Sequence, residues 1–156
     1  MSAPLTAGAK APDFDLPKDG TGNLTLKGMA GKKVALYFYP KDDTSGCTAE
    51  AIDFNRLKGA FAKAGTEIVG VSPDAVKSHD KFKKKHDLSL TLVSDESKKM
   101  LEAYGVWAEK SMYGRKYMGV ERTTFLIGAD GKIAQVWNKV KVPGHAEEVL
   151  KAAQGL

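Results

Sequence analysis

The chain has 156 residues, of which 42% are hydrophobic and 28% are charged, and its net charge is +5. This composition is typical of one soluble globular domain, which we expect to span residues 1–156. Because there is only one cysteine, an internal disulfide is excluded. Residues 1–10 lack the basic start and apolar run of a signal peptide, and no stretch approaches the ~20 apolar residues of a membrane span. We therefore expect a cytoplasmic protein with no membrane partner.

The net charge raises the question of nucleic-acid binding. The densest basic run, KFKKKH, covers residues 81–86. Basic and aromatic residues do not alternate in it, and the chain carries no zinc-finger or recognition-helix signature. The run is typical of a solvated helix face, so we expect no nucleic-acid partner.

In the first part of the chain, residues 11–31 mix short apolar stretches with Gly and Asp, which predicts a small hairpin. The run VALYFY at 34–39 predicts a strand buried on both faces, ended by Pro40. Apolar residues at helical spacing then predict a helix over 48–64, before Gly65.

Later elements follow the same alternation. The sequence predicts a strand at 67–72, a charged helix over about 74–86, a short strand within 90–95 and a helix over 97–104. Residues 123–128 and 132–138 predict an antiparallel hairpin, and 145–153 a last helix. The order predicts an α/β fold with a central mixed β-sheet flanked by helices and the hairpin at one edge.

Cys47 directly follows a predicted strand and loop and lies at the first turn of a predicted helix. Free backbone N–H groups and the helix dipole stabilise an anion there, and the thiolate is the nucleophilic form of cysteine. A lone cysteine is commonly a small buried hydrophobe, which is the alternative. The polar neighbours in DDTSGCT favour a reactive thiol.

The flanking residues are compatible with such a site. Pro40 stiffens the entry to the loop, and Gly46 lets backbone approach a small substrate. Thr44 presents a hydroxyl that can donate or accept a hydrogen bond. Glu50 has the spacing of a capping-box acid, or it orients a cation.

Pro40-x-x-x-Thr44-x-x-Cys47 matches the active-site signature of the peroxiredoxins, and FYPKDDTSGCTAEAIDF at 38–54 resembles their bacterioferritin comigratory protein, or PrxQ, subgroup. The similarity continues in APDFDLP at 11–17, in residues 104–133 and in VKVPGHAEEVL at 140–150. The resemblance implies a thioredoxin-like fold. It also implies an antioxidant peroxidase that reduces hydrogen peroxide and organic hydroperoxides without a metal, haem or flavin.

The resemblance also implies roles for single residues. Cys47 would attack the peroxide and become a sulfenic acid, Thr44 would hydrogen-bond the peroxide, and Pro40 would shield the sulfur from water. Arg122 matches the family's active-site arginine, whose guanidinium would hold the thiolate. The backbone N–H groups of Gly46 and Cys47 would assist.

Two of these residues have ordinary alternatives. An arginine beside a strand, as Arg122 is, is commonly a surface cation, and only the family pattern favours the active site. Trp107 belongs to a stretch with Met112, Tyr113 and Tyr117 that either walls the substrate pocket or packs in the core.

The sequence departs from the family at positions where relatives often carry a proline or a second, resolving cysteine. Ser45 replaces a common proline. Ile52 and Lys83 stand where relatives place a resolving cysteine. The sulfenic acid must then be reduced by an outside thiol, which is thioredoxin, glutathione with glutaredoxin, or Cys47 of a second subunit. Because relatives are often monomers, we expect a monomer.

Other sites are less well supported. His79 and His86 are seven residues apart, about 10 Å along one helix, too far to share a metal ion, so we expect none. Asp42 and Asp43 would oppose a nearby thiolate, so we expect both to point to solvent. His145 begins the last predicted helix and is a weak candidate for a catalytic base.

Two other functions stay open at this stage. A redox sensor or chaperone-like protein would use the same sulfenic acid as a signal, and its site would be identical. A scaffold with an inert thiol would show ordinary reactivity at Cys47 and no effect of replacing Arg122.

Overall fold

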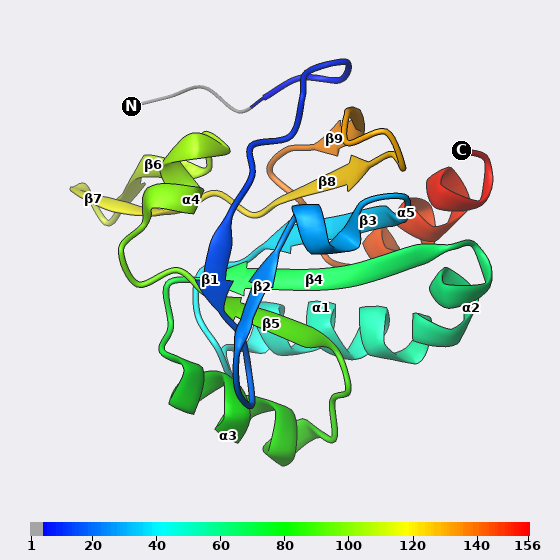
Figure 1. Ribbon diagram of the computed structural model, residues 1–156. Coiled ribbons are helices and arrows are strands. Elements are labelled where there is room, and N and C mark those ends of the chain that lie inside the picture. Colours follow the sequence, from blue (N-terminus) through cyan, green and yellow to red (C-terminus); the bar gives the residue numbers. More distant parts are fainter. Residues whose placement is uncertain (1–4) are drawn as a thin grey trace.

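Strands and helices alternate along the chain, as expected, and Figure 1 shows them in the computed structural model, which describes residues 5–156. Residues 1–4 of the predicted domain lie outside the described residues. The strands are β1 (Asp15–Pro17), β2 (Asn23–Thr25), β3 (Lys33–Phe38), β4 (Thr66–Ser72), β5 (Thr91–Ser94), β6 (Trp107–Met112), β7 (Arg115–Val120), β8 (Thr123–Ile127) and β9 (Ile133–Trp137). The helices are η1 (Lys27–Met29), α1 (Ser45–Arg56), α2 (Lys58–Lys63), α3 (Val76–His86), α4 (Lys99–Ala103) and α5 (His145–Gln154).

The central sheet is mixed, as the element order predicted. Its strand order is β5-β4-β3-β8-β9. β3, β4 and β5 are parallel neighbours, whereas β8 pairs antiparallel with β3 and β9 antiparallel with β8. The predicted hairpins are both present, since β1 pairs with β2 and β8 with β9.

β3 is buried on both faces because its side chains alternate between two hydrophobic clusters. Val34, Leu36 and Phe38 belong to one cluster, and Ala35 and Tyr37 to the other. α1, α2, α3 and α5 supply the second cluster, while α4, η1 and the amino-terminal segment supply the first. Both clusters share the strands of one sheet, which supports our proposal that the chain is a single domain. Among residues 5–156, no helix is long and apolar enough to cross a bilayer.

Two elements differ from the sequence prediction. The predicted helix 48–64 begins earlier, at Ser45, and is divided at Leu57 into α1 and α2. The segment 107–120 forms an unpredicted hairpin, β6–β7, whose turn contains Tyr113 and Gly114 with φ of 52° and 79°. Most of this hairpin is exposed on both faces, so its sequence lacks the alternation that marks a half-buried strand.

The register of β3 and β8 places the functional segments together. Phe38, the last residue of β3, pairs with Thr123, the first residue of β8. Because the two strands are antiparallel, the loop that leaves β3 toward α1 and the residue that precedes β8 meet at the same end of the sheet. Cys47 follows that loop, and Arg122 is the residue before β8.

We predict that Gly70→Ala destabilises the fold by about 1–3 kcal/mol. A Cβ at Gly70 in β4 would lie 2.8 Å from Leu92 Cδ2 and 2.8 Å from Tyr37 Cζ, and Tyr37 is held by a ring stack with Phe54 at 4.7 Å. The matched control is Gly59→Ala in α2, where a Cβ meets nothing within 4 Å and helix propensity favours alanine by about 1 kcal/mol. Urea unfolding would measure both changes. A Gly70→Ala protein as stable as the parent would show that β4 does not require this glycine.

Candidate active site

Cys47 occupies the third position of α1, whose first helical hydrogen bond runs from Thr48 N–H to Thr44 O at 2.8 Å. The N–H groups of residues 45–47 precede that bond, at the positive end of the helix. Cys47 is only 1% exposed and belongs to the cluster between α1 and the sheet. It is therefore buried, as the packing alternative predicted, yet it lies at a helix end that favours an anion.

The Arg122 side chain reaches the sulfur directly. Its Nη2 donates to Cys47 Sγ at 3.2 Å, and its Nη1 donates to Glu50 Oε1 at 2.6 Å. Burial opposes the charge of Arg122, but Glu50 and Cys47 outweigh burial and raise the pKa of the guanidinium. The site thus contains a permanent cation between a carboxyl group and the sulfur, rather than a surface arginine.

Glu50 is almost fully buried beside Arg122. The sequence left two roles open for Glu50, which were to cap the helix or to orient a cation. The structure shows the second, because α1 has no side-chain cap and Glu50 accepts a hydrogen bond from Arg122. Burial raises the pKa of Glu50 from 4.5 to about 7, although Arg122 acts in the opposite direction. Its Oε2 is buried with no hydrogen-bond partner among the described residues, which is compatible with a proton on that atom.

Gly46 lets Arg122 approach the sulfur closely. A Cβ at Gly46 would lie 3.2 Å from Arg122 Nη2, which is tighter than most real contacts of a Cβ. Arg122 has little room to give way, since Glu50 and Cys47 hold it on two nitrogens. The glycine is therefore explained by the close approach of a side chain.

Pro40 and Thr44 flank the loop between β3 and α1. Pro40 is half-buried directly after Tyr39, and Thr44 is the exposed N-cap residue of α1. The Thr44 hydroxyl donates to Lys41 O at 3.0 Å, so its oxygen can still accept a hydrogen bond from a substrate. The structure thus places both predicted residues at the loop that leads to Cys47.

Trp107 lies elsewhere. It packs against the hydrophobic cluster on the opposite face of the sheet from Cys47, with Lys98 Nζ 5.6 Å from its ring centre. Its assignment to the substrate site stays a prediction. Met112, Tyr113 and Tyr117, from the same stretch, are exposed on the β6–β7 hairpin.

The expectation that Asp42 points to solvent was wrong. Asp42 is buried and accepts hydrogen bonds from Tyr39 Oη at 2.6 Å and Ser78 Oγ at 2.8 Å. His79 Nδ1 lies 2.7 Å from Asp42 Oδ2, the oxygen that also accepts from Ser78 Oγ. These partners come from the end of β3 and from α3, and no local pattern in the sequence predicts them.

Asp43, in contrast, is exposed as predicted, and it pairs with Lys85 Nζ at 2.7 Å and His86 Nε2 at 2.8 Å. His145 begins α5 as expected. It is buried, which lowers its pKa to about 4, with the charge of Arg122 acting in the same direction. Its Nε2 lies 2.8 Å from Thr124 Oγ1. A neutral His145 adds no positive charge near Arg122.

The positions that hold resolving cysteines in relatives carry other side chains. Ile52 is exposed on α1. Lys83, on α3, forms an ion pair with Asp19 at 2.5 Å. Cys47 therefore has no internal thiol partner, since the chain contains one cysteine.

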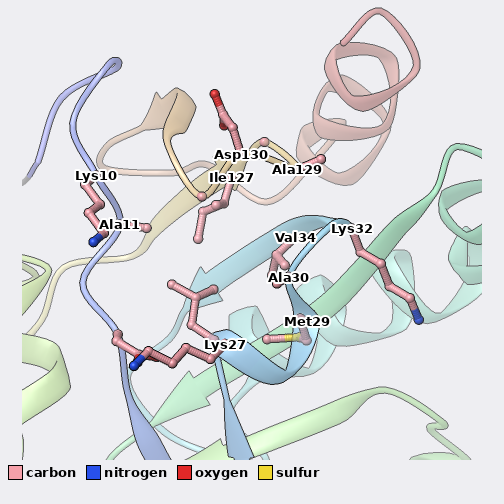
Figure 2. Close-up of a pocket in the computed structure, with 14 residues that line it drawn as sticks. Lys10, Ala11, Lys27, Met29, Ala30, Lys32, Val34, Ile127, Ala129 and Asp130 are labelled. Carbon is pink, nitrogen blue, oxygen red and sulfur yellow. The ribbon is translucent and has the colours of Figure 1, made fainter.

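A separate cavity of about 290 Å³ lies at the other end of β3 (Figure 2). Val34 and Ile127 from the sheet line it together with Met29 from η1 and with Asp130. Val34 is near the start of β3, whereas Cys47 follows its end, and a strand rises about 3.3 Å per residue. None of the predicted site residues lines this cavity, which is distinct from the site of Cys47.

The chain is similar to known proteins over nearly its whole length. The AhpC/TSA family model matches residues 7–136. A putative peroxiredoxin bcp of Coxiella burnetii is 51% identical over 146 residues, which cover 94% of this chain and 97% of that protein. Peroxiredoxin Bcp of Bacillus subtilis is 45% identical and covers 97% of each chain.

Solved structures agree with the sequence relatives. The bacterioferritin comigratory protein of Xanthomonas campestris, solved in a study of its alkyl peroxide reduction, has a TM-score of 0.90 at 45% identity and covers 96% of this chain and 98% of its own. A cysteine-to-serine mutant of PrxQ from Xylella fastidiosa has a TM-score of 0.92 at 39% identity and covers 99% and 98%. The thioredoxin-like fold is thereby confirmed. The chain belongs to the AhpC/TSA family, in its bacterioferritin comigratory protein (PrxQ) subgroup, and is a one-cysteine, thiol-dependent peroxidase.

Proposed function

We propose that Cys47 is the peroxide-reactive cysteine of this peroxidase and that Arg122 activates it. The observation that carries the proposal is the 3.2 Å contact between Arg122 Nη2 and Cys47 Sγ in a buried site. A guanidinium beside the sulfur stabilises the thiolate, as do the N–H groups at the start of α1. The thiolate is the form that attacks a peroxide.

The reaction follows from this arrangement. The Cys47 thiolate attacks the terminal oxygen of a hydroperoxide ROOH, an S–O bond forms, and the O–O bond breaks. The sulfur is oxidised by two electrons to the sulfenic acid, and RO⁻ takes up a proton and leaves as water or an alcohol. Negative charge moves from the sulfur to the leaving oxygen. Arg122, held by Glu50, is within reach of both charges.

In this proposal, the remaining site residues assist the reaction. Thr44 hydrogen-bonds the peroxide through its hydroxyl, and Pro40 limits the access of water to the sulfur. The N–H groups of Gly46 and Cys47 face the same reacting oxygens. The location of these residues in and after the β3–α1 loop supports the assignment.

The substrates that we propose are hydrogen peroxide and organic hydroperoxides. The relative from Xanthomonas campestris, of 45% identity, was studied for alkyl peroxide reduction. Because the chain has no second cysteine, an outside thiol must reduce the sulfenic acid. Thioredoxin is our first choice of reductant and glutathione with glutaredoxin the second. A monomer acting in the cytoplasm, where thiols stay reduced, fits a single free cysteine.

We expect peroxide-dependent NADPH consumption when the protein is coupled to thioredoxin and thioredoxin reductase, and none with Cys47→Ser. A parallel assay with glutathione, glutaredoxin and glutathione reductase identifies the alternative reductant. Turnover in either assay supports the peroxidase mechanism proposed for Cys47. Fast oxidation of Cys47 by one equivalent of peroxide with no turnover in either assay would instead favour a redox sensor. No oxidation at all would contradict the proposal.

We expect Glu50→Gln to remove a pH dependence of stability between about pH 4.5 and pH 7. Burial raises the pKa of Glu50 from 4.5 to about 7, so the folded protein keeps a proton that the unfolded chain releases in this range. The free energy of unfolding of the parent therefore falls as pH rises through the range, relative to that of the variant. Urea unfolding from about pH 5 to about pH 8 measures the difference.

The exposed Glu96→Gln is the matched control for this experiment and should follow the parent at every pH. If the difference in stability between the parent and Glu50→Gln stayed constant over the range, Glu50 would not titrate there.

A further inference from the structure

The loop that precedes Cys47 is anchored by one buried side chain. Lys41, Asp43, Thr44 and Ser45 are exposed, and Asp42 is the buried residue among them. Its carboxylate accepts hydrogen bonds from the hydroxyl of Tyr39, which directly follows β3, and from the hydroxyl of Ser78 in α3. Its backbone N–H donates to Asp74 Oδ2 at 2.8 Å. The position of the loop therefore depends mainly on Asp42.

The central partner of Asp42 is His79, a fully buried residue of α3. His79 Nε2 lies 2.9 Å from Val93 O, which can only accept, so Nε2 carries a proton. His79 Nδ1 lies 2.7 Å from Asp42 Oδ2, and the Tyr39 hydroxyl already donates to Oδ1. Because both carboxylate oxygens of Asp42 already accept from a hydroxyl, Oδ1 from Tyr39 and Oδ2 from Ser78, we infer that Nδ1 carries a proton as well, which makes His79 an imidazolium paired with the Asp42 carboxylate.

A shared metal ion explains these contacts less well. Ligand atoms of Asp42, Asp74 and His79 all lie within 4.8 Å of one another. However, Nδ1 of His79 and Oδ2 of Asp42 are 2.7 Å apart, a direct hydrogen-bond distance. Two ligands at about 2.1 Å from one tetrahedral ion would lie more than about 3 Å apart. Asp74 Oδ2 already accepts a hydrogen bond from Ser72 Oγ at 2.6 Å, so these contacts form a hydrogen-bond network rather than a set of metal ligands.

We propose that Asp42 and His79 are positioning residues that fix the Pro40–Thr44 loop for the reaction at Cys47. The inference rests on the proposed function of Cys47. Asp42 lies midway between Pro40 and Thr44, so a shift of Asp42 moves both residues relative to the sulfur. Val93 O in β5 holds the other side of His79, which connects the loop to the central sheet.

Loss of either partner leaves the other as an uncompensated buried charge or polar group, so the loop would be displaced. A displacement of about 1 Å in groups that contact the reacting atoms can cost up to about 100-fold in rate. The exposed pairs of Asp43 with Lys85 and His86 connect the same loop and helix but are weakened by solvent. Asp42 and His79 therefore affect the rate, and Asp43 and His86 do not.

A pH profile distinguishes positioning from a general loss of structure. Burial opposes the charge of His79, but the hydrogen bond and charge of Asp42, with Val93 O and the charge of Asp74, outweigh burial and raise its pKa above 6.5. Tyr39 is the other titratable group that faces the ring. A raised pKa means that the pair contributes fully below pH 6.5 and is lost as pH rises through the raised value.

The test compares Asp42→Asn and His79→Gln with the matched controls Asp43→Asn and His86→Gln. Stopped-flow oxidation of Cys47 by hydrogen peroxide gives the second-order rate constant, and thermal melting gives stability. We expect the first two variants to react at least about tenfold more slowly near pH 6, while both controls stay within about twofold. The ratio of the parent rate to the His79→Gln rate should shrink as pH rises through the raised pKa of His79.

Parent-like rates in a folded Asp42→Asn or His79→Gln protein would overturn the inference, as would a ratio that does not change with pH. If neither variant folds, Ser78→Ala removes one hydrogen bond to Asp42 and leaves the charged pair intact. A rate for Ser78→Ala lower by more than about twofold, and so outside the range of the controls, supports the inference, and a rate within about twofold of the parent overturns it. Failure of the parent itself to react would overturn the proposed role of Cys47 as well, which separates the two failures.

Discussion

The contact between the Arg122 guanidinium and the Cys47 sulfur is the interaction on which the site depends. A buried guanidinium requires anionic partners, because an isolated charge is strongly disfavoured away from water. Glu50 is one partner, yet burial raises its pKa to about 7, so it is not fully ionised near neutral pH. Glu50 therefore leaves part of the positive charge unbalanced, and in the mechanism that we propose a thiolate at Cys47 balances it. In the same proposed mechanism, the charge of Arg122 also stabilises the oxygen that leaves the peroxide.

The fold supplies this contact through the alignment of two strands. Pairing of Phe38 with Thr123 brings Arg122 to the end of β3, although Arg122 is 75 residues from Cys47 in the chain. The absence of a side chain at Gly46 gives the guanidinium access to the sulfur. The Asp42 carboxylate connects the β3–α1 loop to α3 through hydrogen bonds with Ser78 and His79. The β6–β7 hairpin and the cavity beside η1 lie outside this arrangement.

Local patterns predicted most of the fold but only part of the site. The apolar run 34–39 predicted β3, and the signature from Pro40 to Cys47 indicated the loop that we propose to be reactive. A role for Arg122 needed the family resemblance, because no local feature distinguishes it from a surface cation. Asp42 was assigned to solvent because its partner His79 is 37 residues away and comes close only through packing of α3. The β6–β7 hairpin was missed because strands exposed on both faces carry no alternation.

The role of Arg122 at the sulfur is tested most directly by the second-order rate constant for oxidation of Cys47 by hydrogen peroxide in a folded Arg122→Ala protein, measured by stopped flow. Arg115→Ala, which removes an exposed arginine of β7, is the matched control. We expect a fall of about 100-fold or more for Arg122→Ala, comparable to the loss of a charge-stabilising donor in other enzymes, and no change for Arg115→Ala. An Arg122→Ala protein that reacts as fast as the parent would show that the guanidinium does not activate the sulfur.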